Sequence, residues 1–401
     1  MAKERDNIPV RRFPQFVQEK GWNYVNANEL FEPIVNKNHN SDLPVLAITQ
    51  DQGAVPREKI DYKVIVSEKS IAGYKVVEVG DFIISLRSFQ GGIEYSYYKG
   101  LCSPAYIVLR KKNDTICNDF YRHYFKSWQF IQDLNRNLEG IRDGKMVSYQ
   151  QFSEILIPYP PFVEQQKIAD CLSSIDELIK ISSGKLEMLK IQKEGLMQQL
   201  LTPINGGGGN SCVTPTLRFP KFKNTKGWEI NMLENTVKLF TAAKKLTLVE
   251  YKKSGKYPIV DQSQQYISGY TDDGTALINE NKEGVVIFGD HTCSLKYIDF
   301  PFVQGADGIK IFKSSEPERV MSQYIYYYLC SVPIKSTEYK RHFSDLKKKA
   351  VLFPSLVTEQ QRLIECFLSI DEVITSCKQK QFILEQHKKG LMQQLFPKYR
   401  N

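Results

Sequence analysis

The chain of 401 residues repeats two of its own segments about 200 residues apart. The opening RRFPQFVQEKGW of residues 11–22 returns as LRFPKFKNTKGW at residues 217–228. A longer segment at residues 163–201 returns at residues 358–396, with about half of its positions identical and the block GLMQQL intact both times. This period is far longer than a solenoid unit, so the sequence predicts a tandem duplication of one domain plan.

The sequence between these repeated segments is not itself repeated. ISLRSFQGGIEYSYYKG in the first half has no counterpart in VVIFGDHTCSLKYIDFPFVQGADGIKIF of the second half. This pattern indicates a duplicated frame that presents two different binding surfaces. Ordinary drift of a duplicated domain would give the same pattern, and the sequence leaves both explanations open.

The longer repeated segment has the spacing of a coiled-coil seam. Apolar residues recur in alternating steps of four and three, the 3.5-residue repeat of helices that pack side by side. The seam of the first copy comprises Ile168, Leu172, Ile175, Ile179, Ser182, Leu186, Leu189, Lys193, Leu196 and Leu200. That of the second copy comprises Leu363, Phe367, Ile370, Ile374, Cys377, Gln381, Leu384, Lys388, Leu391 and Leu395. We therefore expect two long helices that pair antiparallel; two helices that each pack on their own domain are the alternative.

Ten seam residues are the candidates for helix pairing and partner docking. They are Ile175, Ile179, Leu189, Leu196, Leu200, Ile370, Ile374, Leu384, Leu391 and Leu395. An aspartate at Leu196 or Leu391 should then weaken helix pairing or partner assembly more than the fold of either domain, because it places a charge on the seam.

Composition along the chain predicts the domain boundaries. LTPINGGGGNSCVTPT is rich in Gly and Pro, which predicts a flexible linker at 203–215. We expect globular domains at 1–160 and 216–355, and helical regions at 161–202 and 356–401. Alternating apolar runs such as VVIFGD and IKIF predict strands. The predicted fold class is α/β (α+β), with two mixed-sheet domains separated by an antiparallel coiled coil.

Composition and charge limit the class of function. Hydrophobic residues make up 42% and charged residues 25%, as in a globular protein. The formal net charge of +9 fits a polyanionic partner such as DNA. The eight cysteines form no C-x-x-C pair, and no apolar stretch has the length of a signal peptide or a membrane span. We therefore expect reduced thiols, no metal site, and a cytoplasmic protein.

These motifs together resemble a known family. The RFP…GW opening of each half, EQQKIA with SIDELI, the closing GLMQQL and GDHT…VQGADGIKI resemble specificity subunits of type I restriction–modification systems. The resemblance implies two target recognition domains, each reading one half of a split double-stranded DNA site, and two conserved helical regions that pair as a coiled coil. It also implies docking of two adenine-methyltransferase subunits and of ATP-dependent restriction subunits. The four-glycine linker departs from the family pattern and leaves the spacing between the half-sites open.

We find no catalytic centre in the sequence. An adenine methyltransferase needs an Asn- or Asp-Pro-Pro-aromatic loop, and Tyr159-Pro160-Pro161-Phe162 begins with a tyrosine that cannot supply the acceptor. No G-x-G-x-x-G follows a predicted strand. We expect a non-catalytic chain without cofactor, while the resemblance implies S-adenosylmethionine, ATP and magnesium for the partner subunits. A self-sufficient modifying enzyme and an architectural coiled-coil protein that binds DNA without sequence preference are the alternatives.

Polar residues that follow an apolar run are the candidates for base contacts in the first half. SLRSFQGG follows the strand-like residues 81–84. Arg87 can contact guanine and Gln90 can contact adenine, while Ser88 and Gly91 belong to the same loop, whose glycines allow close approach of the backbone. An Arg87 that only forms a salt bridge is the alternative.

The second half has candidates of the same kind. They are Asp290, His291, Thr292 and Gln304 for the bases, and Lys347, Lys348 and Lys349 for the phosphates. Asp290 can accept a hydrogen bond from cytosine, or it can hold a turn. The lysines can instead form a solvated basic face of a helix.

Overall fold

The structure is a computed structural model. It describes residues 7–60, 71–136, 147–202, 214–242, 244–279, 283–306, 308–332, 334 and 341–397. Most of the linker predicted at 203–215 lies outside the described residues. The chain forms two compact units: unit 1 comprises Met1–Ser183 and Lys380–Asn401, and unit 2 comprises Gly184–Gln379. Among the described residues, no helix has both the length and the apolar character needed to cross a membrane.

Each unit contains a four-stranded antiparallel sheet with the same strand order. In unit 1 the order is β2-β9-β6-β7, from β2 (Phe31–Ile34), β6 (Phe82–Ile84), β7 (Glu94–Tyr95) and β9 (Ile107–Lys111). In unit 2 the order is β12-β19-β16-β17, from β12 (Val237–Phe240), β16 (Val285–Gly289), β17 (Leu295–Ile298) and β19 (Ile309–Ser314). The two stretches without sequence similarity therefore share a fold, because many different apolar side chains suit a buried strand.

Further strands surround these sheets. Two ribbons pair the first strand of each unit with the strand that precedes its long helix: β1 (Asn23–Asn26) with β10 (Leu156–Tyr159), and β11 (Trp228–Met232) with β20 (Ala350–Pro354). Unit 1 also contains the hairpin of β3 (Leu46–Thr49) and β4 (Gly53–Pro56), and the pair of β5 (Lys75–Val77) and β8 (Gly100–Cys102). Unit 2 contains a second sheet in the order β14-β13-β18-β15, from β13 (Tyr257–Val260), β14 (Gly269–Thr271), β15 (Leu277–Ile278) and β18 (Phe302–Gln304).

Short helices close the cores of both units. Those of unit 1 are α1 (Ala27–Leu30), α3 (Ser88–Gly91), α4 (Asn118–Tyr124), α5 (Trp128–Arg136) and α6 (Tyr149–Ser153). Those of unit 2 are α8 (Leu233–Thr236), α9 (Ser322–Ser331) and α10 (Phe343–Leu346). Tyr324 on α9 is fully buried in the core of unit 2.

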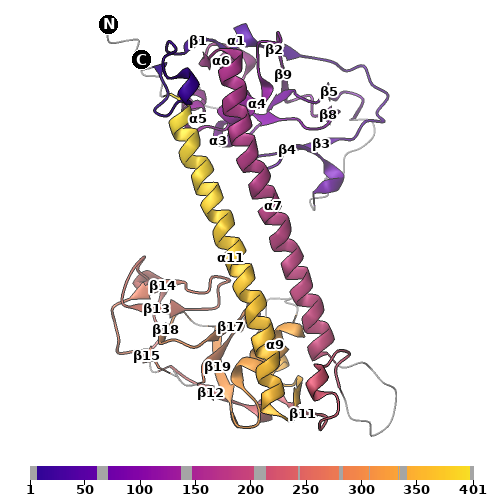
Figure 1. The fold of residues 1–401 in the computed structure, drawn as a ribbon, viewed down its shortest axis with the longest axis vertical. Coiled ribbons are helices and arrows are strands. Elements are labelled where there is room, and N and C mark those ends of the chain that lie inside the picture. The colour runs from indigo at the N-terminus through magenta and orange to yellow at the C-terminus, as the bar shows by residue number, and fades with distance from the viewer. Residues whose placement is uncertain are drawn as a thin grey trace. The chain divides into compact units, whose positions relative to one another are not determined.

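Two long helices, α7 (Phe162–Leu201) and α11 (Val357–Leu395), follow the predicted seams (Figure 1). Every predicted seam position is buried or half-buried. In unit 1, Ile168 at the beginning of α7 shares a core with Leu391 at the end of α11. In unit 2, Leu200 at the end of α7 shares a core with Leu363 at the beginning of α11. The helices are therefore antiparallel within each unit, and the predicted fold class is confirmed.

The same charged contact links the two helices in each unit. In unit 1, Lys388 Nζ on α11 lies 2.5 Å from Asp176 Oδ1 on α7. In unit 2, Lys193 Nζ on α7 lies 2.6 Å from Asp371 Oδ1 on α11. The two lysines are equivalent in the duplication, as are the two aspartates. A charged side chain on an otherwise apolar seam favours one alignment of the helices over others.

A buried ion pair explains why the RFP…GW and EQQ segments are repeated together. The guanidinium of Arg12 makes two hydrogen bonds of 2.7 Å to the carboxylate of Glu164, and both side chains are buried. Arg218 makes the equivalent bonds to Glu359, at 2.7 and 2.6 Å. Loss of one partner would leave a buried charge unpaired, which is strongly destabilising. This pair therefore fixes the start of each long helix to the opening segment of its half.

The next residue of the EQQ segment makes a second repeated contact. Gln165 accepts a hydrogen bond from the backbone N–H of Cys117 at 2.9 Å and donates to the carbonyl of Pro160. Gln360 accepts from Met321 N–H at 2.9 Å and donates to Pro354. Cys117 and Met321 directly precede α4 and α9, so each long helix is tied to a core helix as well.

The end of each long helix belongs to a globular core, which corrects one expectation from the sequence. In unit 1, Leu391 lies in the core, and the ring of Phe396 packs against those of Phe120 and Tyr124. Leu196 packs against the core of unit 2 in the same way. The sequence predicted that an aspartate would weaken helix pairing or partner assembly more than the fold of either domain. For Leu391 this expectation is wrong, because the charge would enter a globular core.

We predict that Leu391→Ala lowers the free energy of unfolding of unit 1 by about 2–5 kcal/mol, because it leaves a cavity in that core. Leu178→Ala on α7, in the same unit, is the matched control. Leu178 is 50% exposed, so a change within about 0.5 kcal/mol is expected. Urea unfolding followed by tryptophan fluorescence measures both variants, and equal losses would contradict the assignment of Leu391 to the core.

Candidate nucleic-acid interface

Except for Gln304 on β18, the candidate base-contacting residues of the two halves lie in equivalent connections of the fold. Arg87, Ser88, Gln90 and Gly91 lie between β6 and β7, and Asp290 to Thr292 lie between β16 and β17. β6 and β16 occupy the same place in the two four-stranded sheets. The sequences of these two loops do not align, so each loop was predicted independently of the other.

In unit 1, two of the four candidate residues between β6 and β7 have exposed side chains. Arg87 and Gln90 are exposed, and among the described residues Arg87 forms no ion pair. Ser88 is buried, and its hydroxyl accepts a hydrogen bond from Ser85 N–H at 2.9 Å, so it shapes the turn. Gly91 packs against the side chain of Gln50.

The backbone of this loop is held closely against α4 and α5. Gly92 has φ +80°, and a Cβ atom there would collide with the carbonyl of Phe125. Asn135 on α5 donates to the carbonyl of Phe89 at 2.8 Å. The glycine is therefore required by both its conformation and its close approach to the neighbouring backbone.

In unit 2, Asp290 holds a turn. Its side chain is buried, and its carboxylate accepts a hydrogen bond from Phe343 N–H at 2.8 Å. Its own N–H donates to the carbonyl of Gly308 at 2.6 Å. The sequence left two roles open for Asp290, a contact with cytosine or the holding of a turn, and these hydrogen bonds are those of the second role. A base contact by Asp290 stays a prediction.

The other candidate residues of unit 2 differ in burial and in their contacts. Thr292 is exposed, and its hydroxyl donates to the carbonyl of Gln262 at 2.6 Å, while His291 is half-buried. Gln304 at the end of β18 is buried, and its carbonyl accepts from Leu246 N–H. Gln262, which was not predicted from the sequence, therefore lies against the loop that carries Thr292.

The three candidate phosphate-binding lysines differ in their surroundings. Lys348 is exposed. Lys349 is half-buried and donates to the carbonyl of Val332 at 2.8 Å, and Lys347 lies 3.9 Å from Glu234. Lys347 and Lys349 thus already interact within the unit, and a phosphate contact by Lys348 stays a prediction.

The ten predicted seam residues are buried or half-buried, and their role in partner docking stays a prediction. The same two helices expose other apolar side chains. They are Phe162, Val163, Leu178, Ile181, Met188 and Ile191 on α7, and Leu368, Val373, Phe382 and Ile383 on α11. Exposed apolar groups of this size along a helix are typical of surfaces that pack against a partner. The sequence analysis missed them because they lie off the strict seam.

Comparisons with known proteins agree with this architecture. Residues 19–190 match the family model described as the type I restriction modification DNA specificity domain. The resemblance predicted from the sequence is confirmed: the chain is related to the specificity subunits of type I restriction–modification systems.

Two specificity subunits are similar in sequence to part of this chain. The chain is 32% identical over 128 residues to the putative type I restriction enzyme MjaX specificity subunit of Methanocaldococcus jannaschii, which covers 32% of this chain and 29% of that protein. It is 24% identical over 160 residues to the type I restriction enzyme EcoR124I/EcoR124II specificity subunit of Escherichia coli, which covers 37% and 38%. The matched stretches thus span less than two fifths of either relative.

Two solved structures share the fold over nearly the whole chain. The S subunit of the type I restriction–modification system from M. genitalium matches with a TM-score of 0.60 and 13% identity, covering 98% of this chain and 100% of that one. A chain from a structure on complex assembly and conformational transition of the type I R-M system matches with a TM-score of 0.52 and 16% identity, covering 96% and 98%.

Proposed function

We propose that this chain is the DNA specificity subunit of a type I restriction–modification complex. Each unit reads one half of a bipartite site in double-stranded DNA, and the two long helices set the spacing and dock two adenine-methyltransferase subunits. The chain itself is non-catalytic and cytoplasmic. Methylation and cleavage, with S-adenosylmethionine, ATP and magnesium, belong to the methyltransferase and restriction subunits.

This proposal rests on one observation: the two units have the same strand order but carry different exposed side chains in equivalent loops. The loop after β6 presents Arg87 and Gln90, and the loop after β16 presents Thr292 beside Gln262. Arginine and glutamine have the donor geometry that reads guanine and adenine edges in the major groove. Two frames of the same shape with different contacts are what recognition of two different half-sites requires.

The exposed apolar side chains on the long helices support the docking role. In unit 1, Phe382 and Ile383 of α11 are 60% and 56% exposed, and Leu178 and Ile181 of α7 are exposed as well. Water contact of such groups is unfavourable, and a partner helix that covers them would gain the corresponding hydrophobic free energy. The sequence-independent architectural protein, by contrast, would not need two different loops at equivalent positions.

Selection from a pool of random-sequence duplexes tests the reading function. The full chain, with its methyltransferase partners, is expected to enrich two short conserved sequences separated by a fixed non-specific spacer. The architectural alternative predicts retention of duplexes without any enriched sequence. Enrichment of a single uninterrupted motif would also contradict the proposal, because it leaves one unit without a half-site.

The docking role is tested by the double substitution Phe382→Asp and Ile383→Asp. Both side chains are exposed, so the unit should keep its fold while the affinity for the methyltransferase subunit falls by about tenfold or more. Gln386→Asp, at an exposed position on the same helix, is the matched control. Titration calorimetry with the methyltransferase subunit measures the affinity, and equal values for the two variants would exclude this surface.

A further inference from the structure

We propose that two glutamine-bearing hairpin loops, β3–β4 in unit 1 and β13–β14 in unit 2, are additional base-reading elements. Gln52 and the pair Gln264 and Gln265 supply their reading side chains, and the lysines Lys126 and Lys296 position the loops. This inference rests on the proposed function and extends it to residues outside the two loops described above.

The two hairpins are equivalent and both are attached to a candidate reading loop. Each follows the first strand of its four-stranded sheet and precedes the strand that leads into the candidate loop. In unit 1, Gln50 Nε2 donates to the carbonyl of Arg87 at 3.3 Å. In unit 2, the carbonyl of Gln262 accepts from Thr292 Oγ1 at 2.6 Å and from Ser294 Oγ at 2.9 Å. Hairpin and loop are therefore joined by hydrogen bonds in each unit.

The tip of each hairpin presents glutamines whose amides remain available. Gln52, Gln264 and Gln265 are exposed, and within the described part of the chain none of the three makes a side-chain hydrogen bond. Glutamine is suited to adenine, because its amide can accept from N6 and donate to N7 at the same time. The amides of Gln52 and Gln264–Gln265 thus add to the Gln90 and Thr292 side chains already found beside them.

Both hairpins have a fixed shape, which an exposed reading side chain requires. In unit 1, Thr49 Oγ1 accepts from Gln52 N–H at 3.1 Å and donates to the carbonyl of Gly53 at 3.0 Å. In unit 2, Asp261 accepts from Ser263 N–H at 2.9 Å and from the hydroxyl of Ser268. Burial would raise the pKa of Asp261, but the hydrogen bonds from Ser268 and Ser263 outweigh it and lower that pKa. The carboxylate is therefore held in its charged form as the centre of the loop.

In each unit, the ammonium group of a lysine donates hydrogen bonds to backbone carbonyls of the hairpin loop. In unit 1, Lys126 Nζ donates to the carbonyls of Gln50 at 3.1 Å and Gly91 at 3.0 Å, and pairs with the buried Glu94. It thereby links the hairpin to the loop after β6. Burial lowers the pKa of Lys126, and the charge of Glu94 opposes that shift.

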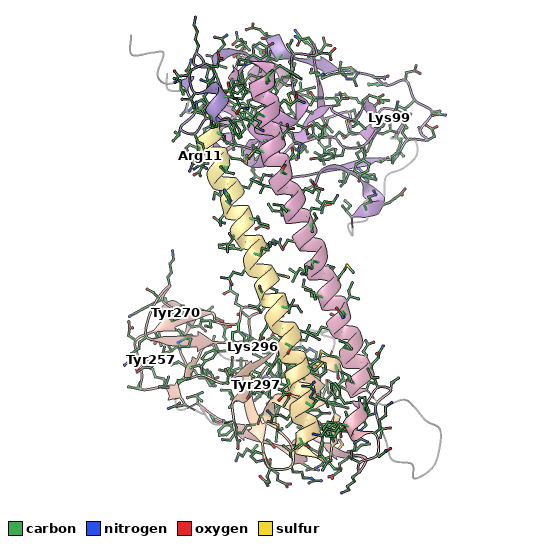
Figure 2. The ribbon with its side chains drawn as sticks, in the orientation of Figure 1. Arg11, Lys99, Tyr257, Tyr270, Lys296 and Tyr297 are labelled. Atoms are coloured by element: carbon green, nitrogen blue, oxygen red, sulfur yellow. The ribbon has the colours of Figure 1, made fainter. Side chains whose placement is uncertain are left out.

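Lys296 does the same in unit 2 from a different element. It lies on β17 (Figure 2), is 4% exposed, and donates through Nζ to the carbonyls of Asp261 at 2.8 Å and Gln265. Burial lowers the pKa of Lys296 as well, against the charge of Asp261. Both ammonium groups are therefore used on loop carbonyls and not on phosphate, which makes Lys126 and Lys296 positioning residues.

The test is the same selection from random-sequence duplexes, carried out with variants of the full chain. Gln52→Ala should reduce the preference for one base pair in one half-site by about tenfold, the loss expected for one bidentate contact. The double variant Gln264→Ala, Gln265→Ala should do so in the other half-site. Gln18→Ala, at an exposed position of unit 1, is the matched control and should leave both half-sites unchanged.

The positioning role is tested by Lys126→Met with Glu94→Gln, which removes the buried pair without leaving a lone charge, and separately by Lys296→Met. The first variant should weaken the base preference in the half-site affected by Gln52→Ala. The second should weaken the base preference in the half-site affected by the unit 2 glutamine variants. Thermal unfolding confirms that each variant is folded; if a lysine variant is not, the glutamine variants decide alone.

The outcomes separate this inference from the proposed function. If the unaltered chain enriches no motif, base reading itself fails. Suppose that the unaltered chain enriches a bipartite motif and that the glutamine variants enrich the same motif, with the same base preference at every position. The hairpins then do not read bases, and the inference is overturned. An equal loss of affinity for all sequences would also overturn it, since that is the signature of a phosphate contact.

Discussion

Each globular unit depends on apolar side chains that its own half of the chain does not supply. The core of unit 1 contains Leu391, Leu395 and Phe396 from the end of α11, and the core of unit 2 contains Met197, Leu200 and Leu201 from the end of α7. The antiparallel pairing of the helices within each unit follows from this exchange, because the end of one helix must meet the beginning of the other. Hydrophobic burial at these ends therefore determines the architecture.

The buried arginine–glutamate pairs complete this frame. Arg12–Glu164 and Arg218–Glu359 fix the beginning of each long helix, while the exchanged ends fix its last turns. A side chain in such a frame has many partners and little freedom to differ between the two copies. The loops after β6 and β16 have no such constraint on their exposed side chains, which is why they can differ while the strand order stays the same.

The sequence was informative about local periodicity and less so about contacts between distant residues. The seams predicted α7 and α11 because a 3.5-residue repeat is visible in a single segment. The same repeat could not reveal that Leu391 belongs to the same core as Phe120, since these residues lie far apart in the chain. The repeats predicted a shared frame, but not its two four-stranded sheets, because strands at equivalent positions need not share side chains. Similarly, Arg87 and Gln90 were found as polar residues after an apolar run, but the hairpin residue Gln50 beside them is 37 positions from Arg87.

Hydrogen exchange on a chain lacking residues 390–401 tests the central claim most directly. If the end of α11 is part of the core of unit 1, the amides of α4 and of β6 and β9 should lose protection on truncation, while those of β16 and β19 in unit 2 keep it. Unchanged protection in unit 1 would show that its core is complete without the second helix, and would contradict the exchange of helix ends on which this architecture depends.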